Sequence, residues 1–244
     1  MVSIPDGSSF RLGYVPGVTP AKWAKIWRER RPDLPLELVA VDVCDSAAAV
    51  GEHRVDIVLT RLPDALAHTD PGPHHTIALY TETTVVVVPK GHLLTAVDEL
   101  TLADVADEQF LWPADDPLPT FRPGAAVKHR PATTGDAVEL VAAGAGLLAV
   151  PQSLARLHHR RDLAYRPLTG APGSTVGLLW TDPTSPPADE FIGIVRGRSA
   201  TSSRSESEPA AKRNAKQKLA AKRAARAASG NTPGGASGQR RRRR

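Results

Sequence analysis

The stretch Phe10-Arg11-Leu12-Gly13-Tyr14-Val15-Pro16-Gly17-Val18-Thr19-Pro20 reads as a strand, a short loop and the start of a helix. Apolar side chains alternate at Phe10, Leu12 and Tyr14, which is the period of a β-strand. Thr19 can cap a helix that runs to Arg31, because Pro20 would then occupy the first helical position, where a missing N–H costs nothing. The loop therefore presents backbone N–H groups at a helix N-terminus, which suits an anion. An ordinary capped helix is the alternative.

Two further strands repeat this arrangement. Leu36 to Val43 and Val55 to Thr60 are rich in apolar and β-branched residues, and Asp45 can cap a short helix between them. Strands that alternate with helices indicate parallel pairing through right-handed crossovers, which defines an α/β fold. Ligands in such sheets bind beyond the carboxyl ends of the strands, so Pro16 to Thr19 and the loop Thr60-Arg61-Leu62 should face one cleft.

A second lobe is expected from Thr83 onward. Thr83 to Pro89 is continuously apolar and β-branched, as in a strand buried on both faces. Capping boxes at Thr101–Asp104 and Thr133–Asp136 indicate helical segments, the second of which should run from Asp136 to Ala143. The remaining elements are expected as strands at 109–112, 127–130, 147–150, 163–167 and 176–181, and as a closing helix at 188–196.

Several short motifs occur in the order found in a known family. They are Arg30-Arg31-Pro32-Asp33 followed by Leu36-Glu37-Leu38; Val55-Asp56-Ile57 before Thr60-Arg61; Val86-Val87-Val88-Pro89-Lys90-Gly91-His92; Leu102-Ala103-Asp104-Val105-Ala106-Asp107-Glu108; and Leu140-Val141-Ala142-Ala143-Gly144-Ala145-Gly146 with Pro151. In these residues the chain resembles the effector-binding half of LysR-type transcription regulators. The resemblance runs from Phe10 to about Gly197 and implies a type 2 periplasmic-binding-protein fold, in which two α/β lobes are joined by two crossover strands.

The resemblance also implies a division of the chain. A short N-terminal segment, 1–9, precedes a substrate-binding domain, 10–198, and a tail, 199–244, follows it. Lobe one is expected at 10–82 and 168–198, lobe two at 90–162, and the crossovers at 83–89 and 163–167. The family carries an N-terminal winged helix-turn-helix, for which residues 1–9 are too few, so we expect a sensor without its own DNA-reading domain. The family's lobe-two helix after Trp112-Pro113 is replaced by the proline-interrupted stretch Ala114 to Gly124, which should reshape one wall of the cleft.

The ligand cleft should receive residues from both lobes. The predicted lining residues are Pro16, Gly17, Val18, Thr19, Thr60, Arg61, Trp112, Pro113, Thr133 and Thr134. Arg61 is expected as a counter-charge, with a solvated loop arginine as the alternative. Trp112 either floors the cleft or packs beneath it, and Thr133 and Thr134 either present a hydroxyl to the ligand or only cap a helix. These groups favour a small anionic metabolite.

Charge divides the chain in two. Residues 199–244 hold four lysines and nine arginines against two glutamates, a net charge of +11, whereas the other 198 residues hold 18 basic and 24 acidic groups, a net charge of −6. Residues 210–228 are mostly strong helix formers, but Leu219 is their only large apolar residue, so the tail should be disordered by itself. It can neutralise phosphates without reading sequence, or it can merely aid solubility. The predicted nucleic-acid contacts are Lys212, Arg213, Lys216, Lys218, Lys222, Arg223, Arg226, Arg240, Arg241, Arg242, Arg243 and Arg244.

Other classes of protein find little support in the sequence. Cys44 is the only cysteine, which excludes internal disulfides and suits a reducing cytosol. No run approaches the roughly 18 apolar residues of a membrane span, and we expect no secretory leader and no membrane partner. His74-His75, in a Pro/Gly loop, and His158-His159 lack zinc-like partners, so no metal is expected. No motif marks a nucleophile or a cofactor site, so neither enzymatic activity nor a cofactor is expected.

The sequence therefore predicts a cytoplasmic sensor of a small anionic metabolite. The resemblance implies a homodimer in which the helix bearing Trp23 and Trp27 and the strand Leu36 to Val43 pair with the second lobe of another copy. Core packing is the alternative for the two tryptophans. The alternative function is that of a nucleic-acid-associated protein that binds through its tail and keeps a vestigial cleft.

Overall fold

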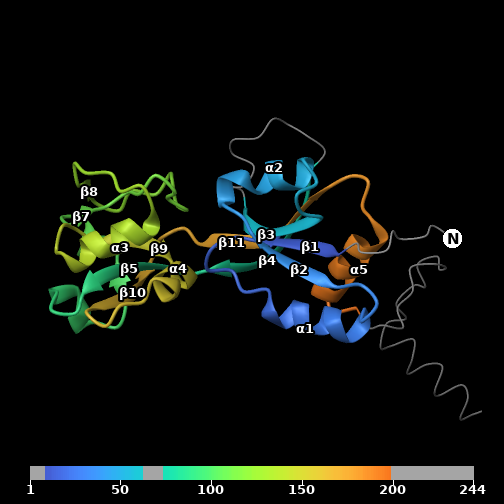
Figure 1. Cartoon of the computed structure of the whole chain (residues 1–244). Helices are drawn as coiled ribbons and strands as arrows, with labels where there is room; N and C mark the ends of the chain where they lie inside the picture. Colours follow the sequence, from blue (N-terminus) through green and yellow to red (C-terminus); the bar gives the residue numbers. More distant parts are fainter. Residues whose placement is uncertain (1–8, 63–73, 199–244) are drawn as a thin grey trace, which may run out of the picture. The chain divides into compact units, whose positions relative to one another are not determined.

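The first sheet orders its strands β2-β1-β3-β11-β4 in a computed structural model that describes residues 9–62 and 74–198 (Figure 1). Its strands are β1 (Phe10–Tyr14), β2 (Leu36–Ala40), β3 (Ile57–Leu62), β4 (His74–Glu82) and β11 (Ser174–Thr181). β1 pairs in parallel with β2 and β3, as the sequence predicted, whereas β11 runs antiparallel to β3 and β4. The carboxyl ends of β1 and β3 therefore lie at the same edge of this sheet.

Helices cover both faces of the first sheet. On one face, α1 (Ala21–Arg30) and α5 (Pro186–Val195) pack over Leu12, Ile57 and Leu59. On the other, α2 (Ser46–Gly51) packs over Val58. The alternation of Ile57, Val58 and Leu59 between the two faces follows from the two-residue period of a strand.

Trp27 belongs to the core of the first lobe. Its ring stacks on Phe10 with the centroids 4.6 Å apart and lies 5.9 Å from the ring of Phe191. Its indole N–H donates to the carbonyl of Leu34 at 3.0 Å, so its one polar group is satisfied. Trp23 is only partly buried against the same cluster. Trp23 and Trp27 were expected either at a dimer interface or in the core, and Trp27 packs in the core.

The second sheet has the order β6-β10-β5-β9. It consists of β5 (Thr84–Pro89), β6 (Leu100–Thr101), β9 (Leu148–Pro151) and β10 (Leu163–Thr169), and the chain passes between the sheets from β4 to β5 and from β10 to β11. Val85 and Val87 face α3 (Thr134–Ala142) and α4 (Gln152–Leu157), while Val86 and Val88 face a separate cluster with Phe110. The prediction of a strand buried on both faces is confirmed for β5.

The start of α1 differs from the prediction. Pro20 takes the N-cap position, and its carbonyl accepts the N–H of Trp23 at 3.0 Å and of Ala24 at 2.9 Å. No side chain caps this helix. The prediction that Thr19 is the N-cap is wrong, because Thr19 lies one residue too early and its hydroxyl remains at the surface.

The sequence did not predict β4. This strand has nine residues and lies at the edge of the first sheet, and its first residues are His74 and His75, which the sequence placed in a loop. Only Ile77 and Leu79 pack against the core, and most of the other side chains are exposed. An edge strand with one solvated face lacks the continuous apolar run by which β5 was found.

Shorter elements replace several predictions in the second lobe. The strand predicted at 109–112 is the shorter β7 (Gln109–Phe110). The prediction of a strand at 127–130 is wrong, because the strand that pairs with β7 is β8 (Ala125–Ala126), which ends before Val127. Asp104 accepts the N–H and the hydroxyl of Thr101, each at 2.7 Å, but only a 3₁₀ turn follows. The capping box at Thr133 and Asp136 is confirmed at the start of α3. Among the helices of the described residues, none is long and apolar enough to cross a membrane.

Candidate ligand-binding site

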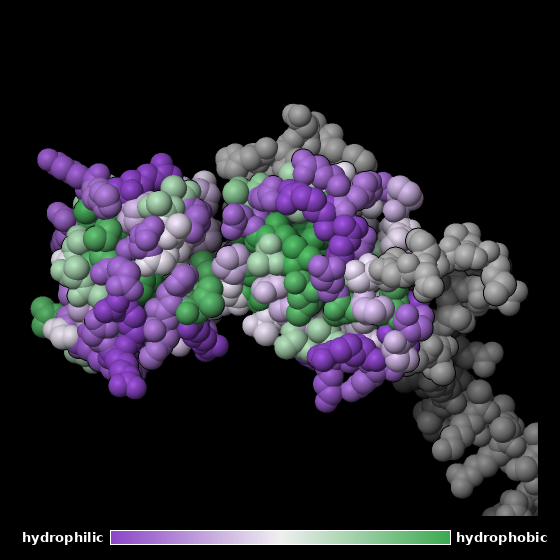
Figure 2. Space-filling view, viewed as in Figure 1, coloured by the Kyte–Doolittle hydropathy of each residue, from purple (hydrophilic) through white to green (hydrophobic). Residues whose placement is uncertain are grey.

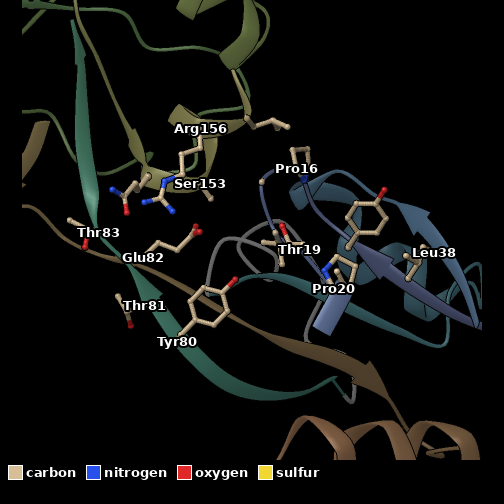
Figure 3. A pocket seen from close by; sticks show the side chains of 16 residues that line it. Pro16, Thr19, Pro20, Leu38, Tyr80, Thr81, Glu82, Thr83, Ser153 and Arg156 are labelled. Carbon is tan, nitrogen blue, oxygen red and sulfur yellow. The ribbon is translucent and has the colours of Figure 1, made fainter. Parts of the chain in front are cut away.

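A cavity of about 790 Å³ lies where the loop after β1, the end of β4 and the first turns of α4 meet (Figure 3). The first two come from the first sheet, and α4 follows β9 of the second. The lining residues are Tyr14, Pro16, Gly17, Val18, Thr19, Pro20, Ala21, Leu38, Tyr80, Thr81, Glu82, Thr83, Gln152, Ser153, Arg156 and Leu157. The volume is in the range of pockets that enclose small metabolites.

The loop after β1 approaches α4 so closely that it requires a glycine. Gly17 has a φ of +81°, in the left-handed region that favours glycine. A Cβ atom at Gly17 would lie 2.8 Å from the hydroxyl oxygen of Ser153 and 3.1 Å from Nη2 of Arg61. The loop is further fixed by Val18, whose N–H donates to the carbonyl of Val15 at 3.1 Å. The loop and α4 are therefore tightly packed against each other.

Arg61 is buried behind the cavity wall with 1% of its side chain exposed. Its guanidinium donates to the carbonyl of Pro16 at 2.8 Å, to the hydroxyl of Ser153 at 2.9 Å and to the carboxylate of Glu82 at 3.2 Å. Arg61 lies inside β3 and not in a loop, so the alternative of a solvated loop arginine is wrong. Its three partners come from the β1–α1 loop, β4 and α4, so this one side chain ties together the segments that form the cavity. Its Nε has no hydrogen-bond partner among the described residues.

Glu82 and Tyr80 bring the end of β4 into the cavity. The Glu82 side chain is 8% exposed, and Figure 3 shows it reaching from β4 into the space between Ser153 and Thr19. Burial raises the pKa of the Tyr80 hydroxyl, and the Glu82 carboxylate raises it further while Arg61 opposes the rise. Tyr80 therefore stays protonated at neutral pH and can donate a hydrogen bond to a bound molecule.

The second lobe contributes the polar side chains of Gln152, Ser153 and Arg156, all on α4. Arg156 is exposed, and its Nε donates to the hydroxyl of Tyr165 at 3.3 Å. This hydrogen bond is long and its acceptor is neutral, so it leaves the charge of the guanidinium uncompensated. Figure 3 shows the Arg156 side chain reaching from α4 into the cavity.

The structure brings together only part of the predicted lining. Pro16, Gly17, Val18 and Thr19 line the cavity, whereas the other six predicted residues do not. Thr60 is fully buried, and its hydroxyl is paired with that of Ser46 at 2.8 Å.

The predicted second-lobe residues are engaged elsewhere. Thr133 caps α3, and the hydroxyl of Thr134 donates to Asp115 at 3.0 Å. Pro113 is buried. Trp112 lies under the guanidinium of Arg122, 4.5 Å from its carbon to the ring centroid, and its indole nitrogen has no partner among the described residues.

Sequence reasoning missed the residues of β4 and α4. Tyr80, Glu82, Gln152, Ser153 and Arg156 all line the cavity. The alternation of Ile77, Leu79 and their polar neighbours was a usable signal for β4, and a helix start directly after Pro151 was one for α4. Within the described ranges, no three His, Cys, Asp or Glu residues are grouped so that they could hold a metal ion.

Comparisons with known proteins identify the family to which this fold belongs. The family model of the LysR substrate binding domain matches residues 7–200, and the chain therefore belongs to this family of effector-binding domains of transcription regulators. No curated protein sequence matches the chain.

Several solved structures share this architecture. Figure 2 shows one face of this chain, on which hydrophilic and hydrophobic residues are both exposed. The BenM effector binding domain with its effector benzoate superposes with a TM-score of 0.63 at 22% identity, covering 78% of this chain and 90% of that one. The oxidized form of OxyR superposes with a TM-score of 0.62 at 20% identity, covering 78% of this chain and 93% of that one. Full-length BenM gives 0.60 at 21% identity, with 80% of this chain and 71% of that one covered. The predicted α/β fold of LysR effector-binding domains is confirmed.

Proposed function

We propose that this protein is a cytoplasmic sensor that binds a small anionic metabolite in the cavity between the β1–α1 loop, the end of β4 and α4. The observation that carries this proposal is the convergence of polar groups from both sheets on one cavity of about 790 Å³. The BenM effector-binding domain, whose fold this chain shares, is described with benzoate, a carboxylate, as its effector.

The cavity offers two groups that favour negative charge. The N–H groups of Ala21 and Lys22 open α1 and have no acceptor within the helix, so they add to the positive end of its dipole. Arg156 supplies a guanidinium with no carboxylate partner among the described residues. Thr19 and Ser153 add hydroxyls. A carboxylate bound between α1 and α4 would satisfy groups from both lobes and thereby stabilise their association.

Ligand-detected NMR on the full chain tests this proposal with benzoate and with its neutral analogue benzamide. We expect benzoate to bind more tightly than benzamide. The substitution Arg156→Gln should lower the affinity for benzoate by roughly tenfold and leave the affinity for benzamide unchanged. Arg161→Gln is the matched control, because Arg161 is exposed and lies outside the cavity lining. Equal binding of benzoate and benzamide would contradict an anion site.

The basic tail supports a second candidate function. Its predicted nucleic-acid-binding residues, Lys212 to Arg244, lie outside the described residues, and the proposal rests on their charge alone. The full chain should bind unrelated DNA duplexes with similar affinity, and the slope of log affinity against log salt should be roughly −4 to −8. Replacing Arg240 to Arg244 by glutamine should make this slope less negative by about 0.9 for each phosphate that the variant no longer neutralises. A strong preference for one duplex would contradict the proposal.

We also propose that the protein forms a homodimer through α1 and β2. β2 is an edge strand of its sheet, its Leu38 is 45% exposed, and Trp23 on α1 is only partly buried. Light scattering at tens of micromolar should give twice the monomer mass, which is about 26.0 kDa. A monomer would contradict this assembly and would leave Trp23 as a packing residue.

A further inference from the structure

Two charged side chains line the cavity in the part of the chain that the structure describes, and a third is hydrogen-bonded to one of them behind the wall. Glu82 and Arg156 belong to the lining, and Arg61 lies directly behind it, bonded to the lining residues Pro16, Glu82 and Ser153. Two guanidinium groups and one carboxylate give this set a net charge of +1. One further negative charge would bring it to neutrality.

We infer that Glu82 sets the charge class of the ligand, so that the cavity accepts a monoanion with an apolar body and rejects a dianion. This inference rests on the proposed anion site and adds the number of charges that the site tolerates. The Glu82 carboxylate accepts a hydrogen bond from the guanidinium of Arg61 at 3.2 Å, so the buried arginine offers no uncompensated charge to a ligand.

The burial of Glu82 makes its charge effective against a second carboxylate. Its side chain is 8% exposed and Arg61 is 1% exposed, so water screens this pair poorly. A ligand that places one carboxylate between α1 and Arg156 would direct a second one toward Glu82 or toward neutral side chains such as Thr81 and Gln152. Repulsion between the Glu82 carboxylate and a second ligand carboxylate in this partly desolvated site should weaken the binding of a dianion by at least about tenfold.

The rest of the lining favours an aliphatic or aromatic body. Tyr14, Leu38, Tyr80 and Leu157 present apolar surface around the polar groups. Val18 and Pro20 add to it from the β1–α1 loop. The ligand class that matches both features is a monocarboxylate with a short aliphatic chain or a single ring.

Matched pairs of ligands test the inference on the full chain at neutral pH. Hexanoate is compared with adipate, and benzoate with terephthalate, because each pair differs chiefly by one carboxylate. In the wild-type protein, the monoanion of each pair should bind at least about tenfold more tightly. In Glu82→Gln, the difference within each pair should fall to about twofold or less, because the amide keeps the shape and removes the charge. Glu29→Gln, an exposed position on α1 outside the lining, should keep the wild-type preference.

The outcomes separate the inference from the function on which it rests. Preference of the wild-type protein for the dianions, or equal binding within each pair, overturns the role of Glu82 and leaves an anion-binding cavity in place. Failure of every carboxylate to bind overturns both. Since Glu82→Gln leaves Arg61 buried without its carboxylate, the comparison is repeated in the Arg61→Met/Glu82→Gln double variant, which keeps no unpaired buried charge and should likewise lose the preference for the monoanions. A double variant that keeps the wild-type preference overturns the role of Glu82.

Discussion

Arg61 and Arg156 lie close to the same cavity but differ in burial and in hydrogen-bond partners. Arg61 is almost completely buried and bonded to a carbonyl, a hydroxyl and a carboxylate, whereas Arg156 is exposed and bonded only to a neutral hydroxyl. The buried arginine has its charge compensated within the protein and holds the segments of the cavity together. The exposed one has charge left for a ligand. The partners of a charged residue, more than its nearness to a cavity, therefore decide whether it is structural or available for binding.

The largest expected effect separates these two arginines by their contribution to stability. Arg61→Met should lower the free energy of unfolding by about 3–5 kcal/mol, because it leaves the Glu82 carboxylate buried without its partner. Arg156→Met should change it by about 0.5 kcal/mol or less. Urea unfolding of the wild-type protein and both variants measures these values, and equal losses would show that the two arginines do not differ in structural role.

A double substitution sharpens the same comparison. Arg61→Met combined with Glu82→Gln should recover most of the loss, because no buried charge then remains unpaired. If the double variant is as unstable as Arg61→Met alone, the loss comes from the hydrogen bonds of Arg61 with Pro16 and Ser153 and not from the ion pair.

Gly17→Ala should have the next largest effect, about 1–3 kcal/mol of destabilisation. The substitution places a Cβ atom at a φ of +81° and within 2.8 Å of the Ser153 hydroxyl oxygen. Gly51→Ala is the matched control, because a Cβ atom at that helical position meets nothing within 4 Å. Thermal unfolding monitored by circular dichroism measures both. A Gly17→Ala protein as stable as the control would show that the loop relaxes away from α4.

The smallest effect concerns a second carboxylate with little exposure, Asp116. Burial raises the pKa of its carboxyl, although the Leu118 N–H and Arg122 act in the opposite direction. A raised pKa in the folded state means that the protonated form stabilises the fold, and this contribution is lost as the pH rises through that pKa. Asp116→Asn should therefore gain stability relative to wild type between about pH 3 and pH 7. Unfolding curves across this range test the sign, and a gain that shrinks as the pH rises would contradict it.

The sequence predicted the elements that depend on local patterns better than it predicted the site. The parallel β1, β2 and β3 follow from local alternation and from strand-helix order, and the Thr133 capping box follows from a fixed spacing. The loop Pro16–Thr19 could be placed at the cavity because parallel strands end at a common edge. Each of these features depends on residues close together in the chain.

The rest of the site depends on interactions between distant segments. Arg61 meets Glu82 and Ser153 across 21 and 92 positions of the chain, so no local pattern could show that its charge is compensated. β4 was missed because an edge strand carries few core residues. Trp112, Thr133 and Thr134 were expected to reach the cleft from the second lobe, but the structure engages their side chains with Arg122, Asp136 and Asp115.

Hydrogen exchange of the full chain, with and without saturating benzoate, tests most directly that the cavity is the ligand site. Binding there should slow exchange in two segments that are distant in the chain, the β1–α1 loop with the first turn of α1 and the first turns of α4, because the ligand bridges them. The same ligand should leave the amides of α3 and β8 unchanged. Slowed exchange around Trp112 and Thr133 without any change at Pro16–Ala21 and Gln152–Leu157 would contradict the account.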